Sequence, residues 1–111
     1  MVEFNVSEVT SVTIIEVKGR IDSMNANELG EALAGEISLG KKQIVLDLSQ
    51  VSYMSSAGLR ELVAAYRKAQ DIEGDMRIAQ PSSRVLDVLE MSGLDTIFQI
   101  FPTNTEAVGS Y

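Results

Sequence analysis

The chain contains no cysteine and no histidine among its 111 residues. It therefore has no thiol nucleophile, no thiolate or imidazole metal ligand, and no imidazole base for a catalytic triad. A phosphate-binding loop of the G-x-x-x-x-G-K-[ST] type is also absent from the sequence. These absences argue against an enzyme, and we expect no catalytic residues, no metal ion and no cofactor.

Long apolar runs and an excess of basic residues are missing as well. No stretch approaches the roughly 18 apolar residues of a transmembrane helix, and the N-terminus lacks the basic start of a secretory signal. We therefore expect no membrane insertion and a cytoplasmic location. The net charge of −7 argues against direct nucleic-acid binding, which needs clustered Lys and Arg, and the simplest explanation of the acidity is solubility.

The sequence shows no internal repeat, low-complexity tract or linker, and its length predicts one domain over residues 1–111. Alternating and compact apolar patterns predict strands at 3–9, 11–19, 42–48, 75–80 and 97–101. Apolar spacing predicts helices at 26–38, 57–72 and 83–91, and residues 103–109 either form a short helix or fray. Asn25 and Glu28 have the spacing of a capping box for the first helix.

This order of elements predicts an α/β domain with a mixed, mostly parallel sheet of four to five strands and three to four packed helices. The first strand is expected to be antiparallel and to lie at an edge. The apolar spacings predict that seven side chains are buried: Leu46, Leu48, Leu59, Leu62, Val63, Leu86 and Leu89.

The stretch YMSSAGLR, residues 53–60, lies between a predicted strand and a predicted helix, at the sheet edge where α/β proteins bind ligands and partners. Ser56 there could cap the helix, which is worth about 0.5–2 kcal/mol. A nucleophilic role is disfavoured because no base is near; Lys68 lies about three turns further along the helix. A phosphate acceptor is also possible, because a helix N-terminus favours negative charge, and Arg60 follows four residues later.

Gly58 weakens the first turn of this helix by roughly 0.5–1 kcal/mol relative to Ala, so we expect a close contact that leaves no room for a side chain at this position. Either a partner approaches closely at this point, or the helix packs tightly against a neighbouring strand.

The segment VLDLSQVSYMSSAGLRELV, residues 45–63, resembles the signature of the bacterial anti-sigma factor antagonists of the STAS domain family. VKGRIDSMNANEL (17–29) and DVLEMSGLDTIFQIF (87–101) are similar to two further family segments, so the resemblance covers nearly the whole chain in order. The length suits a free-standing member. One position departs from the family pattern, because Ser55 stands where the family commonly has Asp.

The resemblance implies a protein that binds a GHKL-type serine kinase, which is also the anti-sigma factor, and thereby releases the sigma factor. In such systems the kinase phosphorylates the serine before the small-residue–Gly pair and breaks the complex, and a metal-dependent phosphatase restores it. This pattern assigns the phosphate to Ser56 and a partner contact to Asp22. The expected partner surface comprises Asp22, Ser55, Ser56, Ala57, Gly58 and Arg60. Asp22 and Ser56 each follow a predicted strand, so both are expected at the same edge of the sheet.

Other functions remain open at this point. The same fold could serve as an accessory subunit of a lipid transporter or another signalling assembly, docking a partner without phosphorylation. A small ligand-binding or enzymatic domain is disfavoured by the absence of His, Cys and a phosphate loop. For Asp22, the alternative to a partner contact is a role in stabilising its own turn.

Overall fold

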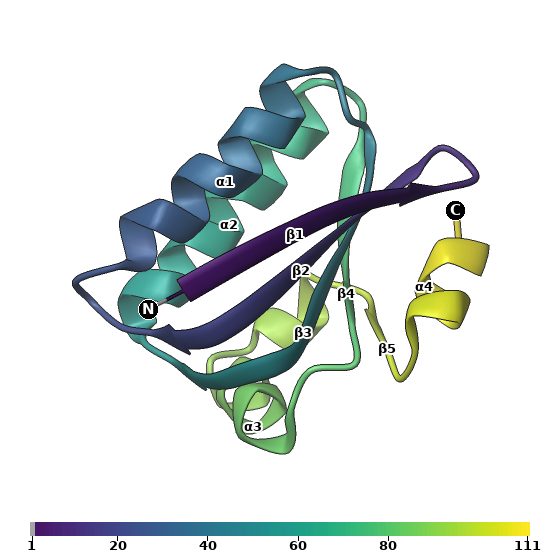
Figure 1. Cartoon of the computed structure of the whole chain (residues 1–111). Coiled ribbons are helices and arrows are strands. Elements are labelled where there is room, and N and C mark those ends of the chain that lie inside the picture. The colour runs from purple at the N-terminus through teal and green to yellow at the C-terminus, as the bar shows by residue number, and fades with distance from the viewer. Residues whose placement is uncertain (1) are drawn as a thin grey trace.

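A five-stranded mixed sheet in the order β1-β2-β3-β4-β5 forms the centre of the computed structural model, which describes residues 2–111 (Figure 1). The strands are β1 Val2–Val9, β2 Val12–Ile21, β3 Gln43–Met54, β4 Asp75–Ala79 and β5 Ile100–Phe101. The helices are α1 Ala26–Ser38, α2 Ser56–Asp71, α3 Ser83–Met91 and α4 Asn104–Gly109, with a 3-10 turn η1 at Leu94–Thr96.

The N-terminal hairpin follows the prediction. β1 pairs antiparallel with β2 at the sheet edge, and every other neighbouring pair of strands is parallel. Thr10 and Ser11 connect the two strands with φ angles of 47° and 68°. Two successive left-handed residues match the twist of a two-residue hairpin, which fixes the register in which Val9 pairs with Val12.

Helices α1, α2 and α3 cover one face of the sheet, and α4 covers part of the other (Figure 1). Right-handed crossovers that advance in one direction, from β2 to β5, place all connecting helices on the same side. The main core therefore lies between these helices and the sheet, where Ile15 of β2, Leu46 of β3 and Leu62 of α2 are fully buried. Burying each such side chain stabilises the fold by about 1.5–3 kcal/mol relative to leaving it exposed.

The buried carboxylate of Asp47 attaches α4 to the opposite face. It accepts hydrogen bonds from the Asn104 Nδ2 at 2.9 Å, the Gln80 Nε2 at 3.2 Å and the backbone N–H of Ser49 at 2.9 Å. These donors compensate the cost of burying the charge. The C-terminal residues therefore form a docked helix rather than a frayed end.

Strand β3 is longer than predicted. The sequence pattern ends at residue 48, whereas the strand runs to Met54 and stays paired with β2 through two register shifts. The shifts change which side chains face inward, so that Val51 and Met54 are buried and the simple alternation is interrupted. The stretch YMSSAGLR therefore begins inside the strand instead of beyond it.

The C-terminal strand is shorter than predicted. Residues 94–96 form η1, and only Ile100–Phe101 pair with β4. Between them, the buried Phe98 contacts Tyr66 of α2 edge-on at a centroid distance of 5.2 Å. The burial predictions hold for Leu46, Leu48, Leu62 and Leu89. Three others, at the margins of the helix faces, are only half-buried: Leu59, Val63 and Leu86.

Candidate functional site

Two turns meet at the end of the sheet where β2 and β3 terminate. Ile21 pairs with Met54, and the backbone N–H of Ser55 donates to the carbonyl of Ile21 at 2.9 Å. The turn that begins at Asp22 and the start of α2 at Ser56 are therefore neighbours. Sequence reasoning expects this juxtaposition from the parallel strand order, and the backbone hydrogen bond is its physical cause.

Ser55, not Ser56, caps α2, so the capping role considered for Ser56 as one alternative is wrong. The Ser55 backbone is extended, with φ −79° and ψ 168°, and its Oγ accepts from the Gly58 N–H at 3.2 Å. The cap lies one residue earlier than expected because the Ser55 N–H completes the β3 pairing while its side chain starts the helix. Ser56 is consequently the first helical residue, and its side chain is exposed.

The same arrangement occurs at the start of α3. Ser82 caps that helix by accepting from the Val85 N–H at 3.4 Å, and the exposed Ser83 is its first residue. A serine at the first position of a helix is thus not unique to α2 among the described residues. What distinguishes Ser56 is its place beside the Asp22 turn, and Ser83 offers a matched comparison.

Gly58 is buried against the ends of both strands. A Cβ atom at this position would collide with the Met54 Sδ and approach the Ile21 Cγ2 to 2.8 Å. Tight packing on the sheet, one of the two alternatives considered for this glycine, therefore explains the bare backbone. Ala57 is half-buried beside it and packs on the core, so the two small residues hold the first turn of α2 close to the sheet.

Asp22 organises the β2–α1 turn. Its Oδ1 accepts from the N–H groups of Met24 at 2.9 Å and Asn25 at 3.1 Å. Asn25 turns its own side chain backwards, accepting from the Asp22 N–H at 2.9 Å and donating to the Arg20 carbonyl at 2.8 Å. The predicted capping box with Glu28 is therefore wrong, because Asn25 already binds the preceding turn. Met24, at the tip, is 88% exposed.

An apolar groove of about 470 Å³ continues from this site along α2. Its apolar lining is Leu59, Val63, Ala64 and Leu94, and Arg60, Arg67 and Ser92 complete it. Arg67 and Leu94 lie outside the predicted site residues. The sequence feature that could have identified Arg67 is its spacing from Ser56 and Arg60, which places all three residues on one face of the helix.

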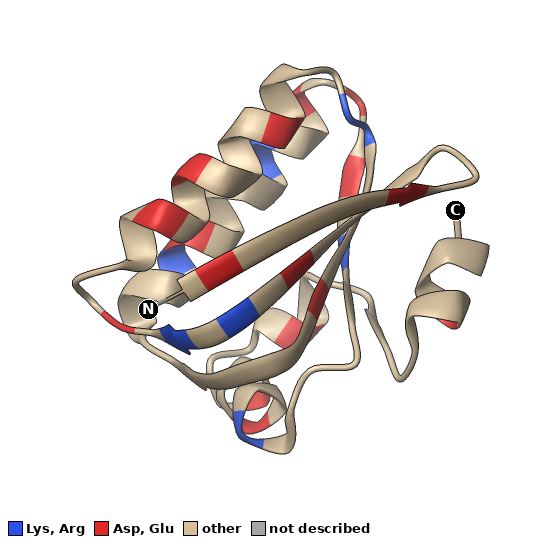
Figure 2. Ribbon diagram, viewed as in Figure 1, with Lys and Arg blue, Asp and Glu red and all other residues tan. Residues whose placement is uncertain are grey.

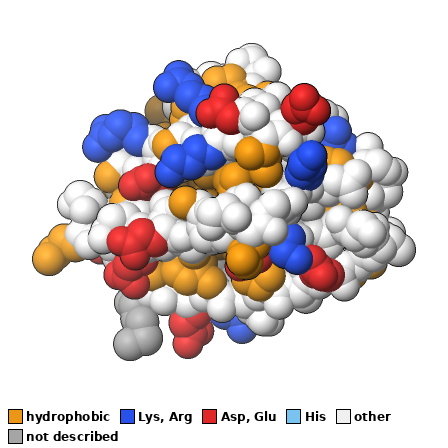
Figure 3. Space-filling model, turned by 90° about the horizontal axis from the view of Figure 1, so that it is seen from above, with side chains coloured by type: hydrophobic (Ala, Val, Ile, Leu, Met, Phe, Trp, Pro, Cys, Tyr) orange, Lys and Arg blue, Asp and Glu red, His pale blue; other side chains and the backbone are white. Residues whose placement is uncertain are grey.

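Charge is distributed unevenly over the neighbouring helices (Figure 2). α1 carries only acidic charged residues, Glu28, Glu31 and Glu36. α2 carries charges of both signs, with Glu61 and Asp71 beside Arg60, Arg67 and Lys68. Viewed from above, the helical side of the molecule shows apolar side chains lying between charged ones (Figure 3).

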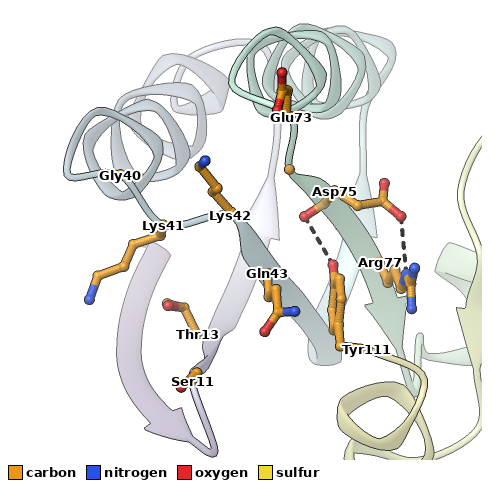
Figure 4. Close-up of a pocket in the computed structure, with 11 residues that line it drawn as sticks. Ser11, Thr13, Gly40, Lys41, Lys42, Gln43, Glu73, Asp75, Arg77 and Tyr111 are labelled. Atoms are coloured by element: carbon orange, nitrogen blue, oxygen red, sulfur yellow. Dashed lines mark hydrogen bonds and ion pairs between the residues drawn. The ribbon is translucent and has the colours of Figure 1, made fainter.

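A polar cavity of about 520 Å³ lies at the opposite end of the parallel strands, where β2, β3 and β4 begin (Figure 4). Arg77 there pairs with Asp75 at 3.0 Å, donates to the Ser110 carbonyl at 2.7 Å and stacks on the Tyr111 ring at 4.0 Å. Burial raises the pKa of the Tyr111 hydroxyl, which accepts from the Ile44 N–H and has the carbonyls of Ile44 and Asp75 within reach of its single proton. These contacts hold the C-terminus.

Within residues 2–111, no three His, Cys, Asp or Glu side chains converge as a metal ion would require. No helix in this range is long and apolar enough to cross a membrane.

Comparison with protein families matches residues 3–107 to the STAS domain. The chain belongs to the STAS domain family. An anti-sigma-B factor antagonist of Listeria monocytogenes is 35% identical over 98 residues, covering 86% of this chain and 84% of that protein. The anti-sigma-F factor antagonist RsfB of Mycobacterium tuberculosis is 28% identical over 104 residues, covering 93% of this chain and 84% of that protein.

The STAS fold is also found in solved structures. The crystal structure of an anti-sigma factor antagonist from Mycobacterium paratuberculosis superimposes with a TM-score of 0.91 at 26% identity, covering 99% of this chain and 93% of that chain. The family resemblance and the predicted α/β fold class are therefore confirmed. The roles of individual residues in this STAS domain remain predictions.

Proposed function

We propose that this STAS domain is an anti-sigma factor antagonist controlled by phosphorylation of Ser56. It binds an anti-sigma serine kinase of the GHKL type through the surface formed by the Asp22 turn and the start of α2. Binding releases the sigma factor for transcription. Phosphorylation of Ser56 breaks this complex, and a metal-dependent serine phosphatase reverses the modification.

The observation that carries the proposal is the exposed Ser56 hydroxyl next to the Asp22 turn, joined through the 2.9 Å bond between Ser55 and Ile21. The first N–H groups of a helix have no partners within it and favour an anion. A phosphate on Ser56 therefore adds about −1.5 to −2 charges without disturbing the cap, which belongs to Ser55. The charge acts on the partner surface and leaves the fold intact.

The chemistry needs no catalytic group from this chain. The kinase supplies Mg²⁺ and the base that takes the hydroxyl proton, while the Ser56 Oγ attacks the γ-phosphorus of ATP and ADP leaves. Water later replaces the Ser56 oxygen on the phosphorus under the phosphatase, giving back serine and inorganic phosphate. Ser55 in place of the family Asp does not interrupt these steps, because the kinase supplies the base and the metal ion. The Ser55 side chain caps the helix instead.

The test is incubation with the cognate kinase, Mg²⁺ and ATP, followed by peptide mass mapping. One phosphate is expected on the peptide containing Ser56, and Ser56→Ala should abolish its incorporation. Ser83 should stay unmodified although it has the same helical position. Phosphate found on Ser55 alone, or no incorporation by a kinase that binds tightly, would contradict the assignment.

Neutralising Asp22 should weaken kinase binding by about tenfold, because the kinase surface loses a charged contact. Asp22→Asn keeps an oxygen for the N–H groups of Met24 and Asn25, so the melting temperature should stay within about 3 °C of the parent value. Isothermal titration and thermal melts measure the two quantities. Asp22→Ala also removes the oxygen that accepts from the N–H groups of Met24 and Asn25. If this variant is less stable but its folded molecules bind the kinase with unchanged affinity, the role of Asp22 is to stabilise its own turn.

A further inference from the structure

The groove beside α2 combines apolar side chains with unneutralised positive charge. Leu59, Val63 and Leu94 form its floor, while neither Arg60 nor Arg67 makes a salt bridge within residues 2–111. None of the residues that line the groove within residues 2–111 is acidic. Other basic residues also lack an ion pair, but Arg60 and Arg67 combine this with a place beside apolar side chains, so the groove is suited to a partner that is both apolar and acidic.

The groove is continuous with the Ser56 site. Ser56, Arg60, Val63 and Arg67 follow one another at intervals of four, three and four residues, so they form a single stripe along the outer face of α2. The opposite face, with Leu62, Ala65 and Ala69, is buried in the core. A partner that covers Ser56 and extends along α2 therefore meets the groove next. At its far side Met91, which precedes the groove residue Ser92, is 87% exposed.

We infer that this groove binds an acidic amphipathic helix of the partner kinase, an inference that rests on the proposed function. Apolar residues of that helix at intervals of three and four fill the floor between α2 and the α3–η1 turn. Its carboxylates lie against Arg60 and Arg67. Because Arg67 lies 11 positions after Ser56, the contact along α2 spans about 16 Å, or about three turns of the partner helix.

The lining favours a helix over an added strand. Groove residues come from α2, from the end of α3 and from η1, so they offer side chains and no unpaired strand edge for β-augmentation. An acidic helix also explains why phosphorylation is disruptive. A phosphate on Ser56 stands one turn from Arg60, competes for that guanidinium group and repels the acidic segment.

Charge reversal at Arg67 tests the inference far from Ser56. Arg67→Glu should weaken binding of the unphosphorylated protein to the cognate kinase by about tenfold or more, measured by titration calorimetry. Lys68→Glu is the matched control, because it makes the same change one residue away. Lys68 faces the α1 side and lines a different cavity, with Ala34 and Ile37. The affinity of the Lys68→Glu variant for the kinase should stay within about twofold of the parent value.

Several outcomes would overturn the inference, and they are separable from failure of the proposed function. Equal affinities of Arg67→Glu and Lys68→Glu, in folded variants, would remove the groove from the interface while a loss of binding in Ser56→Asp still supports the proposed function. If Arg67→Glu instead changes self-association in sedimentation of the protein alone, the groove is a contact between copies of this chain. If the kinase binds neither parent nor variants, the proposed function itself is wrong.

Discussion

Ser56→Asp is expected to lower the affinity for the cognate kinase by about a hundredfold, whereas Ser56→Ala should bind like the unphosphorylated protein. A carboxylate introduced into a covered interface is desolvated without a partner, and truncations or charges that leave such a group unpaired cost about 2–5 kcal/mol. Alanine removes only a hydroxyl that takes no part in the helix cap, since the Gly58 N–H is bound by Ser55.

Ser83→Asp supplies the control for this experiment. Ser83 is the exposed first residue of α3 and follows a serine cap, as Ser56 does in α2. The substitution therefore adds the same charge at an equivalent helix position, where it slightly stabilises the helix. Its affinity for the kinase should change less than threefold. Equal losses in the two variants would show that general charge repulsion, rather than the position of Ser56, controls binding.

Gly58→Ala is expected to destabilise the domain by about 1–3 kcal/mol, a typical cost of overpacking a tight site. For a domain of this size, that corresponds to a fall in melting temperature of roughly 4–8 °C per kcal/mol. The new methyl group would collide with Met54 and Ile21, and the conflict outweighs the roughly 0.5–1 kcal/mol that alanine gains over glycine in a helix. Relief requires the first turn of α2 to move away from the sheet, so kinase binding should fall as well.

Gly35→Ala is expected to stabilise the domain, in contrast to Gly58→Ala. Gly35 lies within α1, and a Cβ there would meet no atom within 4 Å. Only the helical propensity acts at this position, so the variant should be more stable by about 0.5–1 kcal/mol. Thermal melts and urea titrations of both variants measure the comparison. A Gly58→Ala protein as stable as Gly35→Ala would mean that the helix start is not held against the strands.

Local patterns were sufficient for most elements. Helices α1 and α3 begin and end where apolar spacing and flanking residues predict, and α2 is displaced by one residue. The hairpin and the antiparallel edge strand also follow from local alternation. Such signals persist in the sequence because each element must bury one face, and burial imposes a period of about two or 3.6 residues.

The capping assignments failed because hydrogen-bond donors have competing partners. Ser55 and Ser56 are indistinguishable as caps by residue type, and the choice depends on the Ser55 N–H binding Ile21, a residue 34 positions earlier. Asn25 has a suitable cap residue type, yet it binds the backbone of Asp22 and Arg20. Local propensity ranks candidates, but the register of neighbouring strands selects among them.

The sequence by itself determined the elements, their order, the mostly parallel sheet, and the expectation that Asp22 and Ser56 lie at one edge. Only the tertiary structure decided the length of β3, the reason for Gly58, and the groove that joins Arg60 and Arg67 to Leu94. The physical reason is the range of the interactions involved. Periodicity records what each segment buries, whereas register shifts, steric contacts and grooves arise between segments that are distant in the chain.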